Sequence, residues 1–265
     1  MLRLRDLDLH RHLRDPALKQ QFVTPMFDLV APRYDDFTRR FSFGMDAAWK
    51  RELIGLAVAH APAALRVIDL ACGTGDLAFG IARATTGRGT QITGVDASGE
   101  MLTRARARAD AAGAAATADA GRSASAATHT RFELGDLAHL TAADASADLI
   151  TAGYAFRNVA ELAPALAEAA RVTRPGGAIA VLDFYRPTGT VWRAFFLAYL
   201  RAAGNLFGWA WHREPVAYGY IAHSIAAYVS ASEFVAALRA AGFDLVAERR
   251  YLGGGVAIHV ARRRE

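Results

Sequence analysis

The stretch that decides the fold runs from Arg66 to Asp76 and reads Arg-Val-Ile-Asp-Leu-Ala-Cys-Gly-Thr-Gly-Asp. Its apolar first half predicts a buried strand over residues 66–71, and the alanine-rich sequence that follows predicts a helix over residues 77–84. Gly73 and Gly75 stand between the two, where glycine permits a tight turn and lets a ligand approach the backbone. Because the first N–H groups of a helix lack partners within the helix, this unit predicts a ligand site.

The same alternation of short apolar runs and helical stretches continues along the chain. It predicts further strands over residues 91–95, 130–134, 148–154 and 177–184, and helices over 99–111 and 162–172. Two last runs, 243–250 and 256–262, are joined through Gly253-Gly-Gly255 and predict an antiparallel hairpin. The pattern is typical of an α/β, doubly wound, Rossmann-like fold, with a mostly parallel seven-stranded sheet whose last strand is antiparallel.

Three segments depart from this alternation of strands and helices. Residues 1–25 form a charged N-terminal arm, and residues 26–265 form the folded domain. Residues 111–128 are rich in Ala, Thr, Ser and Gly, which predicts a surface loop. Residues 186–229 follow the fifth strand, are rich in aromatic side chains and predict a helical insertion. In a doubly wound fold, an insertion at this edge of the sheet covers the ligand crevice, so we expect it to cover the substrate.

Composition narrows the class of protein. The 265 residues are 53% hydrophobic and 22% charged, as in a globular domain, and Cys72 is the sole cysteine, so no internal disulfide forms and the cytoplasm is expected. The net charge is +5, but the basic residues are scattered and no aromatic residues interleave with them, which argues against nucleic acid. The most apolar segment, residues 192–211, is interrupted by Arg193 and Arg201. It predicts an amphipathic or pocket-lining segment in peripheral contact with a membrane.

Carboxylates at successive strand ends indicate which ligand binds. Asp69 precedes the glycine turn, Asp96 closes the second strand, and Asp136 follows the third. A dinucleotide would place its pyrophosphate beside Asp69 and Asp76 and be repelled, whereas S-adenosylmethionine carries a sulfonium and an ammonium group and no phosphate. The set therefore predicts S-adenosylmethionine and a class I methyltransferase domain. The cofactor-binding residues expected are Asp69, Gly73, Thr74, Gly75, Asp96, Ala97, Asp136 and Leu137.

Each residue also has a simpler interpretation. Asp96 is placed to cap the next helix together with Ser98, and Asp136 is suited to a turn. In the cofactor interpretation, Asp96 accepts hydrogen bonds from the ribose hydroxyls, Asp136 accepts one from the adenine amino group, and Leu137 packs against the adenine ring. Cys72 is expected to be a small buried packing residue.

Further motifs resemble those of the ubiquinone and menaquinone biosynthesis C-methyltransferases. The resemblance runs from about Phe27 to Arg262, nearly the whole chain. Its motifs are Met26-Phe-Asp-Leu-Val-Ala-Pro-Arg-Tyr34-Asp35, Ser42-Phe-Gly44, Trp49-Lys50, the Asp69 to Asp76 loop, Phe156-Arg-Asn-Val159, Arg174-Pro-Gly-Gly177 and Tyr218-Gly-Tyr220-Ile-Ala-His223-Ser224-Ile225. Many methyltransferases share the glycine loop and the Pro-Gly-Gly turn, but Phe-Arg-Asn-Val is more specific.

The resemblance implies methyl transfer to a ring carbon of a prenylated quinol drawn from the membrane, without a metal. Arg157, Asn158 and His223 are the catalytic candidates, and Tyr34, Phe156, Tyr218 and Tyr220 are the substrate-binding candidates. Arg157 would stabilise a phenolate, because a free phenol has a pKa near 10. The alternative for Arg157 is a structural pair with Glu161, and for the tyrosines an aromatic core. A homodimer is compatible with the sequence.

The chain departs from the family at three positions. Ala155 stands where the family usually has Gly, Thr38 where it usually has Asn, and His223 where it often has Glu. An imidazole can accept a proton near neutral pH, so His223 is a candidate proton relay, or else an ordinary helix residue. The alternatives to the quinol are another phenolic small molecule, a non-catalytic scaffold with this fold, and RNA.

Overall fold

The structure, a computed structural model, describes residues 12, 15–61, 65–118 and 128–265. Nearly all of the first fourteen residues of the expected N-terminal arm, and residues 119–127 of the expected surface loop, lie outside these ranges.

A seven-stranded sheet forms the centre of the molecule, in the order β3-β2-β1-β4-β5-β7-β6. All its pairings are parallel except those of β7, which runs antiparallel to both β5 and β6, so the predicted topology is confirmed. The strands are β1 (Arg66–Leu70), β2 (Gln91–Asp96), β3 (His129–Leu134), β4 (Ala147–Gly153), β5 (Thr173–Phe184), β6 (Phe243–Tyr251) and β7 (Val256–Arg263).

Helices cover both faces of the sheet, each over its own hydrophobic cluster. On one face, α4 (Met45–Ala59), α5 (Asp76–Ala84) and α6 (Gly99–Ala118) bury residues such as Leu53, Ile81 and Leu102. On the other face, α7 (Leu162–Val172) and α10 (Ala231–Ala240) bury residues such as Leu166 and Phe234. Helices cover β4 and β5 on both faces. Their sequences are therefore nearly continuous apolar runs, as is typical of central parallel strands.

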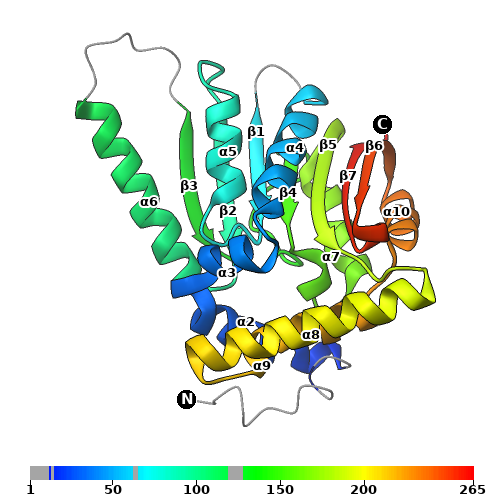
Figure 1. Ribbon diagram of the computed structural model, residues 1–265. Helices are drawn as coiled ribbons and strands as arrows, with labels where there is room; N and C mark the ends of the chain where they lie inside the picture. The colour runs from blue at the N-terminus through cyan, green and yellow to red at the C-terminus, as the bar shows by residue number, and fades with distance from the viewer. Residues whose placement is uncertain (1–11, 13–14, 62–64, 119–127) are drawn as a thin grey trace.

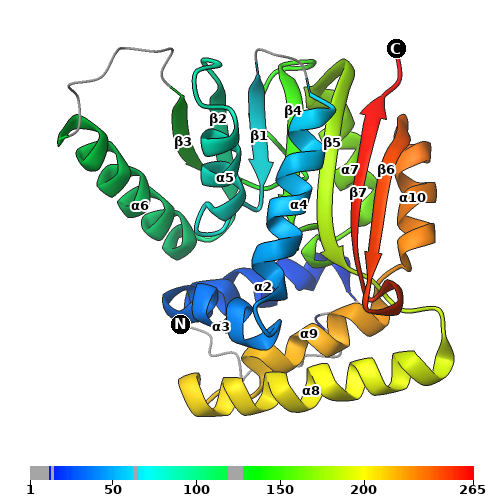
Figure 2. The same ribbon diagram turned by 45° about the horizontal axis from the view of Figure 1, so that its top comes forward.

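A third cluster lies beyond the carboxyl ends of the parallel strands. There α2 (Pro16–Val30), η2 (Ala31–Arg33) and α3 (Tyr34–Phe41) gather with α8 (Thr190–His212) and α9 (Val216–Ala227), as Figures 1 and 2 show. The insertion of residues 186–229 is thus helical and lies across the end of the sheet where ligands bind in doubly wound folds. The short helices η3 (Phe156–Asn158) and η4 (Leu252–Gly254) complete the fold.

Three boundaries differ from those expected. Helix α6 continues to Ala118, into the predicted loop, because the alanine run after residue 111 has high helix propensity. Strand β5 begins at Thr173 and not at residue 177, because Thr173 pairs with Ala147 before the register shifts. Helix α2 begins at Pro16 and buries Phe22 and Val23, so residues 16–25 pack with the domain.

None of the described helices alone has the length and hydropathy required to cross a bilayer; α9 and α10 meet that test only together, across a bend of 70°.

Glycines allow α8 and α9 to approach closely. A Cβ on Gly204 would lie 2.6 Å from the carbonyl oxygen of Tyr218, and one on Gly208 would lie 2.6 Å from that of Glu214. Both clashes involve backbone atoms, which cannot turn aside as a flexible side chain can. The helical hairpin therefore depends on the absence of side chains at these two positions.

Replacing Gly204 with alanine should destabilise the protein. Overpacking costs about 1–3 kcal/mol, which for a chain of this size lowers Tm by roughly 2–10 °C. Gly55→Ala is the matched control: a Cβ there has open space in an exposed part of α4, so it should leave Tm unchanged or raise it. Thermal unfolding followed by circular dichroism measures both, and equal Tm values for the two variants would contradict the close packing.

Candidate active site

The chain turns sharply between β1 and α5. Ala71, Gly73 and Gly75 adopt left-handed backbone conformations, with φ of 49°, 54° and 87°. A Cβ on Gly75 would lie 2.8 Å from the Phe79 ring and 3.0 Å from the Phe132 ring, whereas one on Gly73 would meet nothing within 4 Å. Gly75 is therefore required by packing, while the backbone at Gly73 is open to a neighbouring ligand.

Asp96 links this turn to the end of β2 through hydrogen bonds. One carboxylate oxygen accepts a hydrogen bond from the Gly73 N–H at 2.8 Å, and the other accepts one from the Ser98 N–H at 2.8 Å. Burial raises the pKa of Asp96, while these N–H groups oppose the shift. The capping bond to Ser98 is thus present, and Asp96 also lines a pocket, so the two interpretations of this residue are compatible.

The pocket beside Asp96, here called the adenosine pocket, brings together most of the residues expected to bind the cofactor's nucleoside. Tyr34 and Asn158, expected near the substrate, lie there too. The expected residues in its wall are Tyr34, Gly73, Asp96, Ala97, Asp136, Leu137 and Asn158. Helix α2 adds Gln20, Val23, Thr24 and Phe27, which the sequence analysis missed because no motif marked them as pocket residues.

A second pocket, here called the turn pocket, adjoins the first and shares Tyr34, Ala71, Gly73, Gly153 and Tyr154 with it. Its other lining residues include Lys50, Asp69, Thr74 and Asp76. Asp69 is almost fully buried: its carboxylate accepts hydrogen bonds from the Thr151 hydroxyl at 2.7 Å and the Ala78 N–H at 3.1 Å. Burial raises the pKa of Asp69 to about 7.

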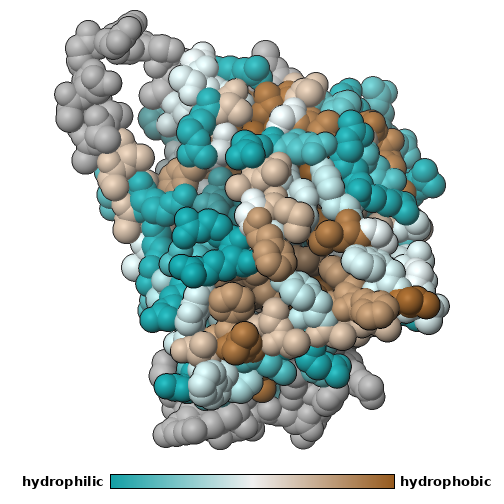
Figure 3. Space-filling model, viewed as in Figure 1, coloured by the Kyte–Doolittle hydropathy of each residue, from teal (hydrophilic) through white to brown (hydrophobic). Residues whose placement is uncertain are grey.

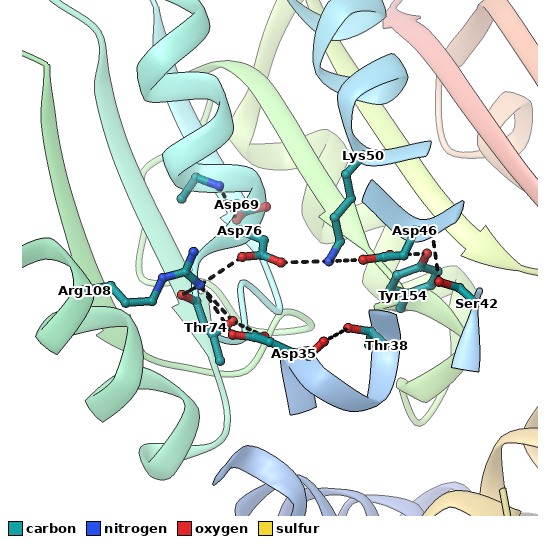
Figure 4. A network of polar contacts seen from close by, with 11 residues as sticks. Asp35, Thr38, Ser42, Asp46, Lys50, Asp69, Thr74, Asp76, Arg108 and Tyr154 are labelled. Atoms are coloured by element: carbon teal, nitrogen blue, oxygen red, sulfur yellow. Dashed lines mark hydrogen bonds and ion pairs between the residues drawn. The ribbon is translucent and has the colours of Figure 1, made fainter. Parts of the chain in front are cut away.

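A network of charges surrounds the turn pocket and links four segments of the chain (Figure 4). Lys50 from α4 lies 2.8 Å from Asp46 and 2.9 Å from Asp76. Arg108 from α6 lies 2.9 Å from Asp76 and also donates to the Thr74 carbonyl at 2.8 Å. The Thr74 hydroxyl donates to Asp35 at 2.8 Å. The motifs that contain Asp35, Lys50 and Thr74 are distant in sequence and meet here.

Arg157 lies in the short helix η3, directly after β4, and is 5% exposed. Its guanidinium donates to the Ser224 hydroxyl at 3.0 Å and the Asn158 side-chain oxygen at 3.1 Å, and its Nε lies 3.4 Å from Asp183. Burial raises the pKa of Asp183 to about 6, against the opposing effect of Arg157. The partner of Arg157 is thus Asp183 of β5, and not Glu161 as the structural alternative supposed.

The remaining candidates divide into two groups. Tyr220 donates to the Asn158 side-chain oxygen and so belongs to the Arg157 cluster. Phe156 is fully buried in the core against Phe234, and Tyr218 stacks on Phe37 with ring centroids 3.7 Å apart, so both are core residues and neither lines a pocket described here.

His223 lies in α9 and is half-buried, next to Ser224, which joins the Arg157 cluster. Its expected role as a proton relay stays a prediction. Ser224 stands in one of the family motifs but was not expected at the site, and Asp183 was not expected either. The signal for Asp183 was a carboxylate within the apolar run of β5.

Hydrogen bonds near both ends of helix α2 hold it over the adenosine pocket. Lys19 donates to the Arg157 carbonyl at 3.0 Å and Gln20 to the Asn158 carbonyl at 3.3 Å. Farther along, Asp28 accepts from the Ser98 hydroxyl at 2.5 Å. Burial and the nearby charge of Arg157 lower the pKa of Lys19 to about 8.

An apolar cavity of about 330 Å³ lies on the far side of Tyr154. Tyr154 stacks on Phe184 with centroids 5.2 Å apart, and Phe184 lines this cavity. Its other walls are almost wholly aromatic or aliphatic and come from α3, α4, α8 and η4: Phe41, Phe43, Met45, Trp49, Trp192, Phe195, Phe196, Tyr199, Leu200 and Leu252. Figure 3 shows hydrophobic side chains gathered in the lower right of the view, over α8.

Both pockets fit a cationic ligand without phosphate groups. Four carboxylates line them, those of Asp69, Asp76, Asp96 and Asp136, whereas Lys50 is the one Lys or Arg among the described lining residues. This balance of charge disfavours a pyrophosphate and favours a sulfonium with an ammonium group.

Comparison with known proteins identifies the family. The ubiE/COQ5 methyltransferase family matches residues 16–263. This chain belongs to the ubiE/COQ5 methyltransferase family. It is accordingly an S-adenosylmethionine-dependent methyltransferase. It is 42% identical over 247 residues to a demethylmenaquinone methyltransferase of Parafrankia sp. (strain EAN1pec), covering 92% of this chain and 95% of the relative.

A second relative carries a name that matches this family. The ubiquinone/menaquinone biosynthesis C-methyltransferase UbiE of Geotalea daltonii is 34% identical over 229 residues, covering 85% of this chain and 89% of that one. Among solved structures, the [4+2]-cyclase SpnF has a TM-score of 0.63 at 19% identity, with 92% of this chain and 96% of that chain covered. Because SpnF is named a cyclase, the shared fold alone does not identify the reaction.

Replacing Asp96 with alanine should weaken the binding of S-adenosylhomocysteine, the demethylated product. Loss of a charged hydrogen-bond acceptor costs about 1–3 kcal/mol, which isothermal titration calorimetry resolves. Asp110→Ala removes an exposed carboxylate from α6 and is the matched control. Unchanged affinity in the Asp96→Ala variant would remove Asp96 from the cofactor site.

Proposed function

We propose that this chain methylates a ring carbon of demethylmenaquinol, giving menaquinol. The relative from Parafrankia sp. reported above, which is 42% identical, is named for that activity. The observation in the structure that supports it is a buried arginine, Arg157, whose guanidinium lies 5.8 Å from the ring of Phe184, a wall residue of the apolar cavity, and whose neighbour Asn158 lines the adenosine pocket. A prenylated quinol needs both features, because its ring must lose a proton and its tail is insoluble in water.

The chemistry requires the ring carbon to become nucleophilic. S-adenosylmethionine, when bound, supplies a methyl group activated by its sulfonium. The substrate hydroxyl, with a pKa near 10, must be deprotonated for the ring carbon to attack. The permanent charge of Arg157 stabilises the phenolate, whose proton leaves to a water molecule at the site. The ring carbon takes the methyl group as the bond from that group to sulfur breaks. The proton on that ring carbon then leaves while the oxygen regains one, which restores the aromatic ring.

Arg157 is held in one orientation by its neighbours. Asp183 faces its Nε, and Ser224 and the Asn158 side-chain oxygen accept from its terminal nitrogen. Asn158 is itself oriented, since its amide nitrogen donates to the Tyr154 carbonyl at 2.8 Å. A charge fixed in this way needs no reorganisation when the phenolate forms, which is how a preorganised site accelerates a reaction.

Bulk solvent is kept from the reacting groups by the helices beyond the sheet. Helix α2 covers the adenosine pocket with Val23 and Phe27, and α8 with α9 closes the end of the sheet. The apolar cavity receives the first part of the prenyl chain, between Phe184 and the aromatic side chains of α8. Tyr154 separates this cavity from the cofactor pockets and so borders the reacting ring.

The test is direct conversion in vitro. The purified protein, S-adenosylmethionine and chemically reduced demethylmenaquinone in detergent should yield menaquinone, measured by mass spectrometry after oxidation. A benzoquinol of the ubiquinone pathway and a phenol without a prenyl chain serve as competing substrates. Preference for either would contradict the proposal, and the absence of methyl transfer to all three would favour a scaffold role.

Substituting Arg157 with lysine should lower kcat by about a hundredfold while leaving the affinity for S-adenosylhomocysteine unchanged. Lysine keeps the charge but cannot contact Asp183, Asn158 and Ser224 at once, because it lacks the planar fork. Arg131→Lys, at an exposed ion pair on β3, is the control. Full activity of the Arg157→Lys variant would remove the reaction centre from the end of β4.

We further propose that the enzyme lies in the cytoplasm and rests on the membrane through α8. This 23-residue helix contains no Asp or Glu, carries Arg193 and Arg201, and exposes Val191, Phe195, Leu206 and Trp209 by 54–73%. An apolar helix face with the exposed Arg201 beside it suits the boundary of an anionic bilayer. The substrate would then enter the apolar cavity, which Phe195 also lines, directly from the lipid.

Flotation with vesicles containing phosphatidylglycerol checks this contact. The wild type should float with the vesicles, and the double variant Phe195→Glu with Leu206→Glu should remain in the soluble fraction. Val246→Glu, which alters an exposed residue of β6, should float like the wild type. A wild type that stays entirely soluble would rule out the membrane contact.

A further inference from the structure

A polar cavity, here called the arginine cavity, lies between the loop that follows β5, the start of α10 and the end of β6. Its volume is about 300 Å³, and its described lining residues are Arg186, Thr188, Ser230, Ala231, Ser232, Arg250, Gly253 and Gly254. Two of these residues carry a permanent positive charge, three carry a hydroxyl group and none is acidic. The cavity therefore suits an anionic ligand that accepts several hydrogen bonds.

Arg186 is held in place by a backbone carbonyl and one carboxylate. Its Nε donates to the Tyr228 carbonyl at 3.0 Å, and its Nη2 lies 3.1 Å from the Glu233 carboxylate. A guanidinium has five N–H donors, and the contacts with other described residues use only those of Nε and Nη2. Since the side chain is 35% exposed, the Nη1 group is accessible to a ligand.

Arg250 is held in the same way. Its Nε donates to the Glu248 carboxylate at 2.8 Å, and its Nη2 donates to the Ser232 hydroxyl at 3.1 Å, which leaves Nη1 without an acceptor among the described residues. The ion pairs of both arginines lie at the surface, where such pairs contribute little. The two carboxylates thus orient the guanidinium groups and leave them able to bind a further anion.

The turn between β6 and β7 forms a wall of bare backbone. Gly253 and Gly254 adopt left-handed conformations with φ of 61° and 83°, and a Cβ on Gly254 would meet nothing within 4 Å, so a ligand can approach closely. The start of α10 adds no free charge, because the Ser230 hydroxyl caps it by accepting from the Glu233 N–H. The preference for an anion therefore comes from the two arginines.

Trp192 connects the arginine cavity to the exposed apolar face of α8. Its indole nitrogen donates to the Leu252 carbonyl at 2.7 Å, and a Cβ on Gly253 would lie 2.7 Å from the same nitrogen. Trp192 is 44% exposed, and Phe195 continues the exposed face along the helix. Figures 1 and 2 show the turn between β6 and β7 next to the start of α8. Tryptophan is enriched at the level of lipid headgroups, so the cavity lies where a bilayer under α8 would present them.

We propose that the arginine cavity binds the phosphate group of an anionic phospholipid, with Arg186 and Arg250 donating to its non-bridging oxygens. Contacts between arginine and phosphate are strong and geometrically specific. The hydroxyl groups of Thr188 and Ser232 can bond to the glycerol of a phosphatidylglycerol headgroup. The acyl chains of the same lipid would then lie along Trp192 and the apolar face of α8.

Vesicle sedimentation with the full chain tests the proposal, which deepens the proposed function and rests on the proposed membrane contact of α8. The vesicles contain equal parts of phosphatidylcholine and phosphatidylglycerol. Arg186→Gln and Arg250→Gln should each lower the partition coefficient by at least about tenfold, as expected when hydrogen bonds to a charged group are lost. A charge that only lies near an anionic surface contributes about fivefold.

Arg249→Gln is the matched control. Arg249 precedes Arg250 in β6, so its side chain lies on the opposite face of the sheet, where it pairs with Glu52 at 3.2 Å. This variant should lower partitioning by no more than about fivefold. Equal losses in Arg249→Gln and Arg250→Gln would indicate a diffuse attraction between charges and contradict the site.

Arg250→Lys separates charge from geometry. Lysine keeps the charge but lacks the planar fork, so this variant should still partition several-fold more weakly than the wild type. Partitioning equal to that of the wild type would mean that charge alone suffices, and the two-arginine site would be wrong. Thermal unfolding checks that each variant is folded, and Tm should change little because the ion pairs lie at the surface.

Calorimetry with two soluble probes distinguishes a lipid headgroup from a free phosphate. Dihexanoyl phosphatidylglycerol, below its micelle concentration, should bind to the wild type and should lose affinity in Arg186→Gln and Arg250→Gln. Inorganic phosphate should bind much more weakly, because it cannot contact α8. If inorganic phosphate binds as tightly as the lipid, the cavity is a site for a free anion and the assignment to phospholipid is wrong.

Failure of this inference is distinguishable from failure of the proposed function. Methylation of demethylmenaquinol in detergent uses neither arginine, so it would stand even if Arg186→Gln and Arg250→Gln partitioned normally. Loss of lipid binding in these variants would support the cavity even if another quinol were the substrate. A wild type that binds dihexanoyl phosphatidylglycerol through both arginines but stays soluble beside vesicles would contradict the contact of α8 and retain the headgroup site.

Discussion

The left-handed turn between β1 and α5 is the constraint on which the rest of the site depends. Ala71, Gly73 and Gly75 reverse the chain within five residues, so that the turn meets the end of β2 at Asp96. The turn also forms the wall shared by both cofactor pockets. Ala71 holds a conformation that costs a residue with a Cβ about 1 kcal/mol or more, which the packing around β1 must offset.

Around this turn, positively charged side chains lie next to negatively charged ones. Two buried cations near the turn lie beside carboxylates: Lys50 between Asp46 of its own helix and Asp76 of α5, and Arg157 beside Asp183 of β5. Removing one partner from such a buried pair is far more costly than breaking a pair on the surface, because the remaining charge stays without solvent. The networks therefore hold α4, α5 and the end of β4 in register while leaving individual donor groups for ligands.

The sequence predicted those parts of the site that follow a rule of the fold. Asp69, Asp96 and Asp136 could be placed because the carboxyl ends of parallel strands meet at one edge of the sheet. Asp183 could not be paired with Arg157, because the pairing joins β5 to the end of β4 and local sequence suggested Glu161. Phe156 and Tyr218 stand in specific motifs but pack in the core, since a motif does not reveal which way a side chain faces. The pocket wall contributed by α2 left no signal, because Lys19 and Gln20 contact backbone carbonyl groups that every residue type carries.

The position of α2 has a consequence for how the protein is made. Helix α2 is synthesised well before its partners, which come much later in the chain: Ser98 near the start of α6, Arg157 and Asn158 in η3, and Tyr220 in α9, whose ring packs 5.6 Å from that of Phe22. Contacts between residues so distant in sequence form slowly, since a long loop must close first. The sheet can assemble before α2 has contacted its partners. Synthesis must pass residue 220 before α2 can cover the cofactor pocket. In this enzyme α2 is thus synthesised long before the residues that hold it in place.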